Sequence, residues 1–262
     1  MPIIGTRASH GTSSRFKSVV SGGTLTSDAT YYYRTFTGNG TLTVSDSTLT
    51  CDVLIGAGGG SGGGTGSGSA SGGGSYTSGY AAAPGSYNFV IGAVQNDSIG
   101  IGITAYAGGA GSQPGNGPSG GSGAGGGYQS GGVYSGGAAT KASGGTILYG
   151  NAGGNSVIAS GGTTGSGGGG GWGSAGGQNY SVGPVNEKFG FGGPAGSGTT
   201  AYNSWSQATG IGQLSGGVYY IGGGAGGTAE AGTQPDALGI GANSSGYNGS
   251  GFVMVRYLKT AV

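Results

Sequence analysis

Charged residues are scarce in this chain of 262 residues. Lysine, arginine, aspartate and glutamate together make up 6% of it, and the formal net charge is +1 at pH 7. Such a composition gives no basic surface of the kind that binds nucleic acid or an anionic membrane. Disordered chains are usually rich in charge and poor in aromatic residues. Because 16 Tyr, 6 Phe and 2 Trp accompany the low charge, the composition favours an ordered protein.

Cysteine and histidine are almost absent as well. A single cysteine, Cys51, excludes an intramolecular disulfide framework and a cysteine-rich metal site. A single histidine, His10, leaves few arrangements for metal binding or acid–base catalysis. No run of 18 apolar residues is present, and the first 17 residues lack the apolar core of a signal peptide. We therefore expect no membrane insertion, no cofactor and no secretory routing.

The sequence offers no convincing catalytic motif. The dinucleotide-binding pattern G-x-G-x-x-G recurs by chance in a chain this rich in glycine and carries no weight. Lys141 lacks the preceding glycine and the following Ser or Thr of a phosphate-binding loop. The seven acidic residues are scattered, and nothing in their spacing indicates a pair of catalytic carboxylates. We expect a protein that is not an enzyme.

Glycine dominates what is present, with 75 residues. Residues 56–75 contain only Gly, Ala, Ser and Thr, which disfavours both a helix and a packed strand. One alternative is a flexible linker. The other is an extended helix of three residues per turn, like polyproline II but built from glycine, whose backbone groups pair with neighbouring copies. Because only glycine allows such close approach, and the composition favours order, we expect the second.

Between the glycine-rich runs lie short segments typical of β-strands. Residues 49–55 place Leu49, Cys51, Val53 and Ile55 on one face of a strand, which predicts a buried Cys51. Residues 252–258 are expected to form the closing strand, with Arg256 on the face opposite Val253, Val255 and Tyr257. Residues 31–36, 41–44 and 49–55 are separated by short turns and predict a meander. Further strands are expected at residues 86–91, 98–106, 146–149 and 156–159.

These alternating segments predict a mostly irregular, all-β fold. A small antiparallel β-sandwich forms the base, and the glycine runs leave it as a bundle of polyglycine-II helices. At ~3.1 Å per residue, runs of eight to ten residues would extend about 25–30 Å, with turns at the far end. We expect two parts, a basic N-terminal arm at residues 1–29 and a folded domain at residues 30–262.

Aromatic and amide residues occur in the turns expected at the far end. Such side chains on a stiff scaffold are typical of binding surfaces, because aromatics give large contact areas at low entropy cost. The alternative is that the aromatics only plug the ends of the bundle. The expected binding residues are Tyr180, Lys188, Phe189, Tyr202, Asn203, Trp205 and Gln207. The basic arm, which is either a mobile tail or a docking peptide, contributes Arg7, His10, Arg15 and Lys17.

Several segments resemble one family of proteins. Residues 35–44 and 52–60 look like the start of the glycine-rich domain of tailed-bacteriophage fibre proteins. Residues 86–93 are similar to the middle strand of that domain, residues 249–257 to its closing strand, and residues 4–9 to the N-termini of such proteins in marine phages. The resemblance covers about residues 30–258, and the chain lacks the larger docking domain of the T-even long-tail-fibre adhesins.

The resemblance implies a virion protein that contacts other virion proteins through its N-terminal arm. It also implies that loops on a polyglycine-II scaffold bind a host glycan or outer-membrane protein. The alternative is a structural decoration or head-fibre protein without a receptor. The position on tail or head stays open, as does the oligomeric state, with a homotrimer as the form common among fibres. A third function, ice binding, needs a regular Thr or Ala face that the sequence does not show.

Overall fold

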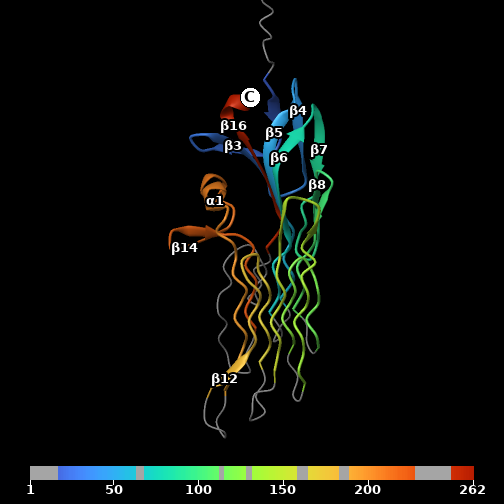
Figure 1. The fold of residues 1–262 in the computed structure, drawn as a ribbon, viewed down its shortest axis with the longest axis vertical. Helices are drawn as coiled ribbons and strands as arrows, with labels where there is room; N and C mark the ends of the chain where they lie inside the picture. The colour runs from blue at the N-terminus through green and yellow to red at the C-terminus, as the bar shows by residue number, and fades with distance from the viewer. Residues whose placement is uncertain are drawn as a thin grey trace, which may run out of the picture.

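The computed structural model describes seven stretches of the chain, which form one elongated body. They comprise residues 17–62, 68–111, 115–127, 132–157, 165–182, 189–227 and 249–262, with backbone only at 180–182 and 189–191. The β-sheets and the C-terminus lie at one end, and glycine-rich segments run side by side toward the other (Figure 1).

Sixteen strands and two short helices are assigned within these stretches. The strands are β1 (Val19–Ser21), β2 (Thr24–Ser27), β3 (Tyr31–Phe36), β4 (Gly40–Ser45), β5 (Leu49–Gly56), β6 (Gly74–Ala82), β7 (Gly85–Phe89), β8 (Ser98–Gly100), β9 (Ile103–Ala105), β10 (Ala142–Ser143), β11 (Ile147–Tyr149), β12 (Tyr180–Val182), β13 (Phe189–Phe191), β14 (Gln213–Ser215), β15 (Val218–Tyr220) and β16 (Phe252–Leu258). The helices are α1 (Asn203–Thr209) and the 3₁₀-helix η1 (Lys259–Ala261).

The strands form antiparallel sheets, which confirms the all-β prediction. The largest sheet has the order β11-β6-β5-β16-β3-β2, and two three-stranded sheets have the orders β1-β4-β7 and β10-β9-β8. The meander expected over residues 31–55 is wrong, because β3 and β5 flank β16 while β4 pairs with β1 and β7. By joining the other sheet, β4 packs Leu42 and Val44 across the core from Val53 instead of beside it.

The first hydrophobic core fills the space between the large sheet and the small ones. Alternate residues of β5 and β16 point into it, including Val53 and Val255, which are 2% and 0% exposed. Cys51 belongs to this core, as its position in the alternating pattern predicts. The opposite face of the large sheet carries a second core, where Leu54 and Met254 pack against Trp205 of α1. The large sheet is therefore covered on both faces.

Two local differences from the sequence prediction concern turns. Residues 98–106 form the hairpin β8–β9 rather than one strand, because the chain turns at Ile101 and Gly102, where φ is +48° and +76°. Strands β1 and β2 pair with β4 and β3, so the expected arm of residues 1–29 overlaps the sheets from residue 19 onward. Residues 1–16 of that arm lie outside the described residues.

The glycine-rich segments are buried although they have almost no side chains. Residues 68–75, 121–127, 165–172 and 221–227 are all buried. Their backbone groups hydrogen-bond to neighbouring segments, and donors three residues apart reach the same neighbour. Gly167 and Gly170 donate to Gly126 and Gly123, Gly168 and Gly171 donate to Gly177 and Ser174, and Gly169 donates to Ala225. Buried backbone groups must be paired, and here the pairing joins segments to one another.

Candidate functional site

The end of the molecule remote from the sheets carries the hairpin β12–β13 (Figure 1). Its register pairs Tyr180 with Phe191 and Val182 with Phe189. Two of the expected binding residues, Tyr180 and Phe189, therefore lie on adjacent strands at this distal end. Lys188, which precedes Phe189, lies outside the described residues.

Asparagine side chains fix the backbone beside this hairpin. The Oδ1 atom of Asn179 accepts a hydrogen bond from the Val157 backbone N–H at 2.7 Å, and its Nδ2 donates to the Val157 carbonyl at 2.9 Å. Asn155 accepts from the Gly136 N–H at 2.9 Å, and Asn116 accepts from the Ser135 N–H at 3.0 Å. These amides hold neighbouring segments of the distal end together.

The described part of this end is uncharged. No Lys, Arg, Asp or Glu occurs in residues 115–127, 132–136, 151–157 or 175–182. Val133 is 63% exposed, and the neighbouring Tyr134 forms an antiparallel bridge with Ser156. The side chains described here offer apolar contact and hydrogen bonding.

The second group of expected binding residues is not in a distal loop. Tyr202 precedes α1, while Asn203, Trp205 and Gln207 belong to it, and α1 packs against β2 and β3 at the sheet end. Tyr202 and Trp205 are 6% and 3% exposed, so the prediction of exposed binding aromatics is wrong for both. They lie three residues apart, which places them on one helical face toward the sheet. That spacing, followed by Gly210 in the left-handed conformation (φ +76°), is the signal that sequence reasoning missed.

The other two residues of this group have different roles. Asn203 is half-buried, and its Oδ1 accepts a hydrogen bond from the Tyr219 N–H at 2.9 Å, which fixes hairpin β14–β15 to α1. Gln207 is exposed on the outer face of the helix.

The hydroxyl of Tyr202 pairs with that of Tyr149 at 2.7 Å, and burial together with this bond raises the pKa of Tyr202.

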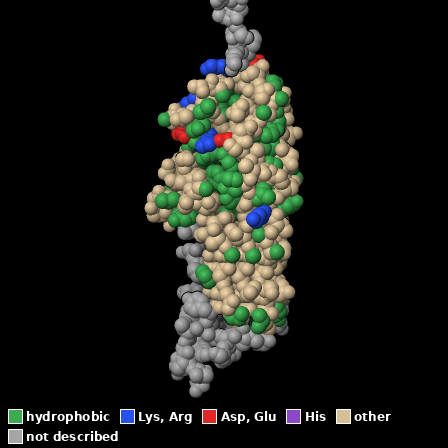
Figure 2. Space-filling view, in the orientation of Figure 1, with side chains coloured by type: hydrophobic (Ala, Val, Ile, Leu, Met, Phe, Trp, Pro, Cys, Tyr) green, Lys and Arg blue, Asp and Glu red, His purple; other side chains and the backbone are tan. Residues whose placement is uncertain are grey.

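A charged group lies next to the second core. The guanidinium of Arg256 pairs with the carboxylate of Asp52 and lies over the rings of Tyr31 and Trp205. This places Arg256 opposite Val253 and Val255, as predicted. Figure 2 shows a basic and an acidic side chain together on this face, above a hydrophobic patch. Because the charged groups of Arg256 and Asp52 pair with each other and the guanidinium contacts both rings, we interpret the cluster as structural.

The residues expected to dock to other virion proteins lie partly outside the described residues, namely Arg7, His10 and Arg15. Lys17 is exposed, and its Nζ donates to the Val262 carbonyl at 3.0 Å. The neighbouring Ser18 donates its backbone N–H to the Ala261 carbonyl at 3.2 Å. Residues 17–18 and the C-terminus therefore lie together at the sheet end, opposite β12–β13.

In the described part of the chain, no group of three or more His, Cys, Asp or Glu residues could hold a metal ion, and no helix is long and apolar enough to cross a membrane. The sequence matches no protein-family model, and comparison with curated proteins gives no significant match.

Proposed function

We propose that this protein is a bacteriophage fibre or adhesin protein of the virion. In this proposal its glycine-rich segments are polyglycine-II helices that form a stiff rod, and the turns at the distal end bind a receptor on the host surface. The observation that carries the proposal is the three-residue repeat of hydrogen bonds between buried glycine-rich segments.

The repeat supports a threefold helix because of which neighbour each residue reaches. In a helix of three residues per turn, positions i and i+3 face the same way, and successive positions face three directions. Residues 167–171 follow this rule, with donors three apart reaching the same neighbouring segment. The same holds for Gly123 and Gly126, which donate to Asn151 and Gly154. A β-strand would instead alternate between two directions.

The requirement for glycine supports the same arrangement. An added Cβ atom at Gly125 would lie 1.9 Å from the Gly167 carbonyl oxygen, and one at Gly169 would lie 2.0 Å from the Ser69 oxygen. These positions contact backbone, which cannot move aside as a flexible side chain can. The segments are therefore as close together as glycine alone permits.

The positions of the chain ends and of β12–β13 support a role in displaying the distal turns. Residues 17–18 and the C-terminus share the sheet end, whereas β12–β13 lies at the other end (Figure 1). A protein attached to a particle through the sheet end would point β12–β13 outward. With Tyr202 and Trp205 buried, the proposed receptor contacts are Tyr180, Lys188 and Phe189.

The test is binding of the purified, fluorescently labelled protein to a panel of bacterial strains. The distal variant Tyr180→Ala/Lys188→Ala/Phe189→Ala is compared with the control Lys259→Ala, which changes a residue of η1 at the sheet end. We expect the distal variant to lose binding and the control to retain it. Loss of binding in both variants, or no binding to any strain by the wild-type protein, would contradict the receptor-binding role.

A second measurement tests the scaffold and the position in the particle. Hydrogen exchange should be slow at the buried amides of residues 121–127 and 165–172, and rapid exchange there would rule out a rigid rod. Quantifying the chain in purified virions distinguishes the alternatives, because an adhesin is present in few copies and a capsid decoration protein in many.

A further inference from the structure

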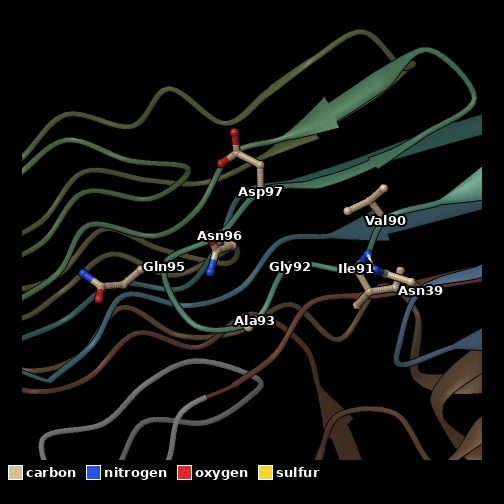
Figure 3. Close-up of a pocket in the computed structure, with 8 residues that line it drawn as sticks. All are labelled: Asn39, Val90, Ile91, Gly92, Ala93, Gln95, Asn96 and Asp97. Carbon is tan, nitrogen blue, oxygen red and sulfur yellow. Dashed lines mark hydrogen bonds between the residues drawn. The ribbon is translucent and has the colours of Figure 1, made fainter.

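A hollow of about 540 Å³ opens on the flank of the molecule, away from β12–β13. It lies where β7 leads to β8, at the junction between the sheets and the glycine-rich segments. Figure 3 shows Asn39, Val90 and Ile91 on one side of Gly92, and Gln95, Asn96 and Asp97 on the other. Its volume is in the range of sites that bind small molecules, about 300–1,000 Å³.

The hollow contains the only charge in a long part of the sequence. Between Asp52 and Lys141 the chain has one charged residue, and this residue is Asp97. Asp97 is exposed and lines the hollow. Three residues with side-chain amides line it too, namely Asn39, Gln95 and Asn96, although the Gln95 side chain points away from Asn39 and Val90 (Figure 3). The glycine-rich surroundings offer backbone groups that are mostly paired, so this cluster of polar side chains stands apart from them.

The polar loop is held firmly by its backbone. The Gln95 N–H donates to the Gly59 carbonyl at 2.8 Å, and the Asn96 carbonyl accepts from the Gly58 N–H at 3.1 Å. Gln95 has a φ of +61°, a conformation that residues other than glycine rarely adopt.

Asp97 and Asn39 keep hydrogen-bonding capacity after their structural roles are met, whereas Nδ2 of Asn96 donates to the Val94 carbonyl at 3.0 Å. Asp97 uses Oδ1 to accept from the Ala107 N–H at 2.7 Å, which leaves Oδ2 as an acceptor. Asn39 uses Oδ1 to accept from the Ile91 N–H at 2.8 Å, which leaves its NH₂ group as a donor. Val90 is 47% exposed and adds an apolar wall.

We propose that this hollow binds a neutral saccharide unit. Sugar hydroxyl groups donate to the Asp97 carboxylate and accept from the amide of Asn39, while the C–H face of the ring lies on Val90. No lysine or arginine is among the eight lining residues, which disfavours phosphate or an acidic sugar. One carboxylate among three amides in a hollow of this size also fits a polyhydroxylated ligand better than a metal ion.

The proposal is independent of receptor binding at the distal end. The two sites share no residue, so a failure of one leaves the other in place. The distal variant described above should bind saccharide normally, and variants of the hollow should leave the contacts of Tyr180 and Phe189 unchanged.

The test is an NMR titration of the isotope-labelled full chain with a panel of neutral sugars: glucose, galactose, mannose and N-acetylglucosamine. The side-chain NH₂ signals of Asn39, Gln95 and Asn96 report on the hollow directly. We expect them to shift with at least one sugar. No shift with any of the four would overturn the proposal.

Two isosteric variants then identify the binding groups. Asp97→Asn keeps the acceptor for Ala107 but removes the charge, and Asn39→Asp keeps the acceptor for Ile91 but removes the donor. We expect each to weaken binding about tenfold or more, because a charge-assisted or donor hydrogen bond is lost. The control Asp46→Asn removes an acid in the turn between β4 and β5 and should not weaken binding. Equal effects of all three variants, or none from the first two, would overturn the assignment.

Discussion

Arg256 in β16 forms an ion pair with Asp52 in β5, with 2.5 Å between Nη2 and Oδ2. The two residues are 204 positions apart in the sequence, and their side chains are 20% and 18% exposed. The guanidinium also lies 4.4 Å from the ring centre of Tyr31 and 4.5 Å from that of Trp205. The Arg256 side chain therefore connects β16 to Asp52 and Tyr31 in the first half of the chain and to Trp205 in α1.

We expect Arg256→Lys to destabilise the protein although it keeps the charge. Lysine lacks the planar group that lies between two rings, so the variant should lose about 1–2 kcal/mol of unfolding free energy. Arg256→Ala should lose about 3 kcal/mol, because it also leaves the half-buried Asp52 carboxylate without its partner. Denaturant unfolding measures both values. If Arg256→Lys matched the wild type, the charge alone would account for the role of Arg256.

Trp205 should matter for stability and not for receptor binding. Its side chain is 3% exposed and packs edge-on against Tyr33 and Tyr202. Trp205→Ala should therefore lower the unfolding free energy by about 3–5 kcal/mol. Gln207→Ala, on the exposed face of the same helix, is the control and should change it by less than about 0.5 kcal/mol. A Trp205→Ala protein of normal stability that fails to bind cells would instead restore Trp205 as a contact residue.

The faces of β5 and β16 were predictable from the sequence. Asp52 and Arg256 lie opposite Val53 and Val255, so the face toward the first core follows from the period of two, although Leu54 and Met254 make the other face apolar as well. The burial of Cys51 follows from the same pattern. The glycine-rich runs could be expected to be ordered, because low charge and many aromatics argue against disorder.

Sheet partners and the position of Trp205 were not predictable in the same way. The local sequence of residues 40–45 does not indicate that β4 pairs in the opposite sheet and not with β3. Its pairing with β1 and β7 is determined by non-local contacts. Trp205 sits in a segment rich in Ser, Thr and Gly that resembles a loop, and its burial depends on a sheet face to which strands far away in the sequence contribute, with Leu54 before it and Met254 after it. Tyr180 and Phe189 lie at the end remote from the sheets, as expected for residues next to a turn between two glycine-rich runs.

We expect the glycine-rich segments to reject alanine at positions that contact backbone. A methyl group at Gly125 would lie 1.9 Å from the Gly167 carbonyl oxygen. Gly125→Ala should thus cost about 1–3 kcal/mol or more, because neighbouring segments must move apart and weaken their hydrogen bonds. Gly38→Ala is the matched control, since an added Cβ there meets nothing within 4 Å. Similar thermal unfolding of Gly125→Ala and the control would show that the segments are not closely packed.

Cys51 should serve as a probe of global unfolding. Its thiol is 3% exposed and donates to the Tyr80 carbonyl at 3.6 Å, and burial with the nearby charge of Asp52 raises its pKa to about 12. In the unfolded chain the pKa returns toward 9.0, so the folded state holds the proton more tightly. The resulting stability is fully present below pH 9 and is lost as pH rises toward 12.

A thiol reagent at pH 8 should therefore modify Cys51 slowly in the native protein and rapidly in denaturant, because the reactive species is the thiolate. The native rate should rise about tenfold for each ~1.4 kcal/mol of stability that the Arg256→Ala and Gly125→Ala variants lose, since modification then passes through opened molecules. The control Gly38→Ala should react at the wild-type rate. Rapid labelling of the native protein would show that the first core opens locally, without unfolding of the glycine-rich segments.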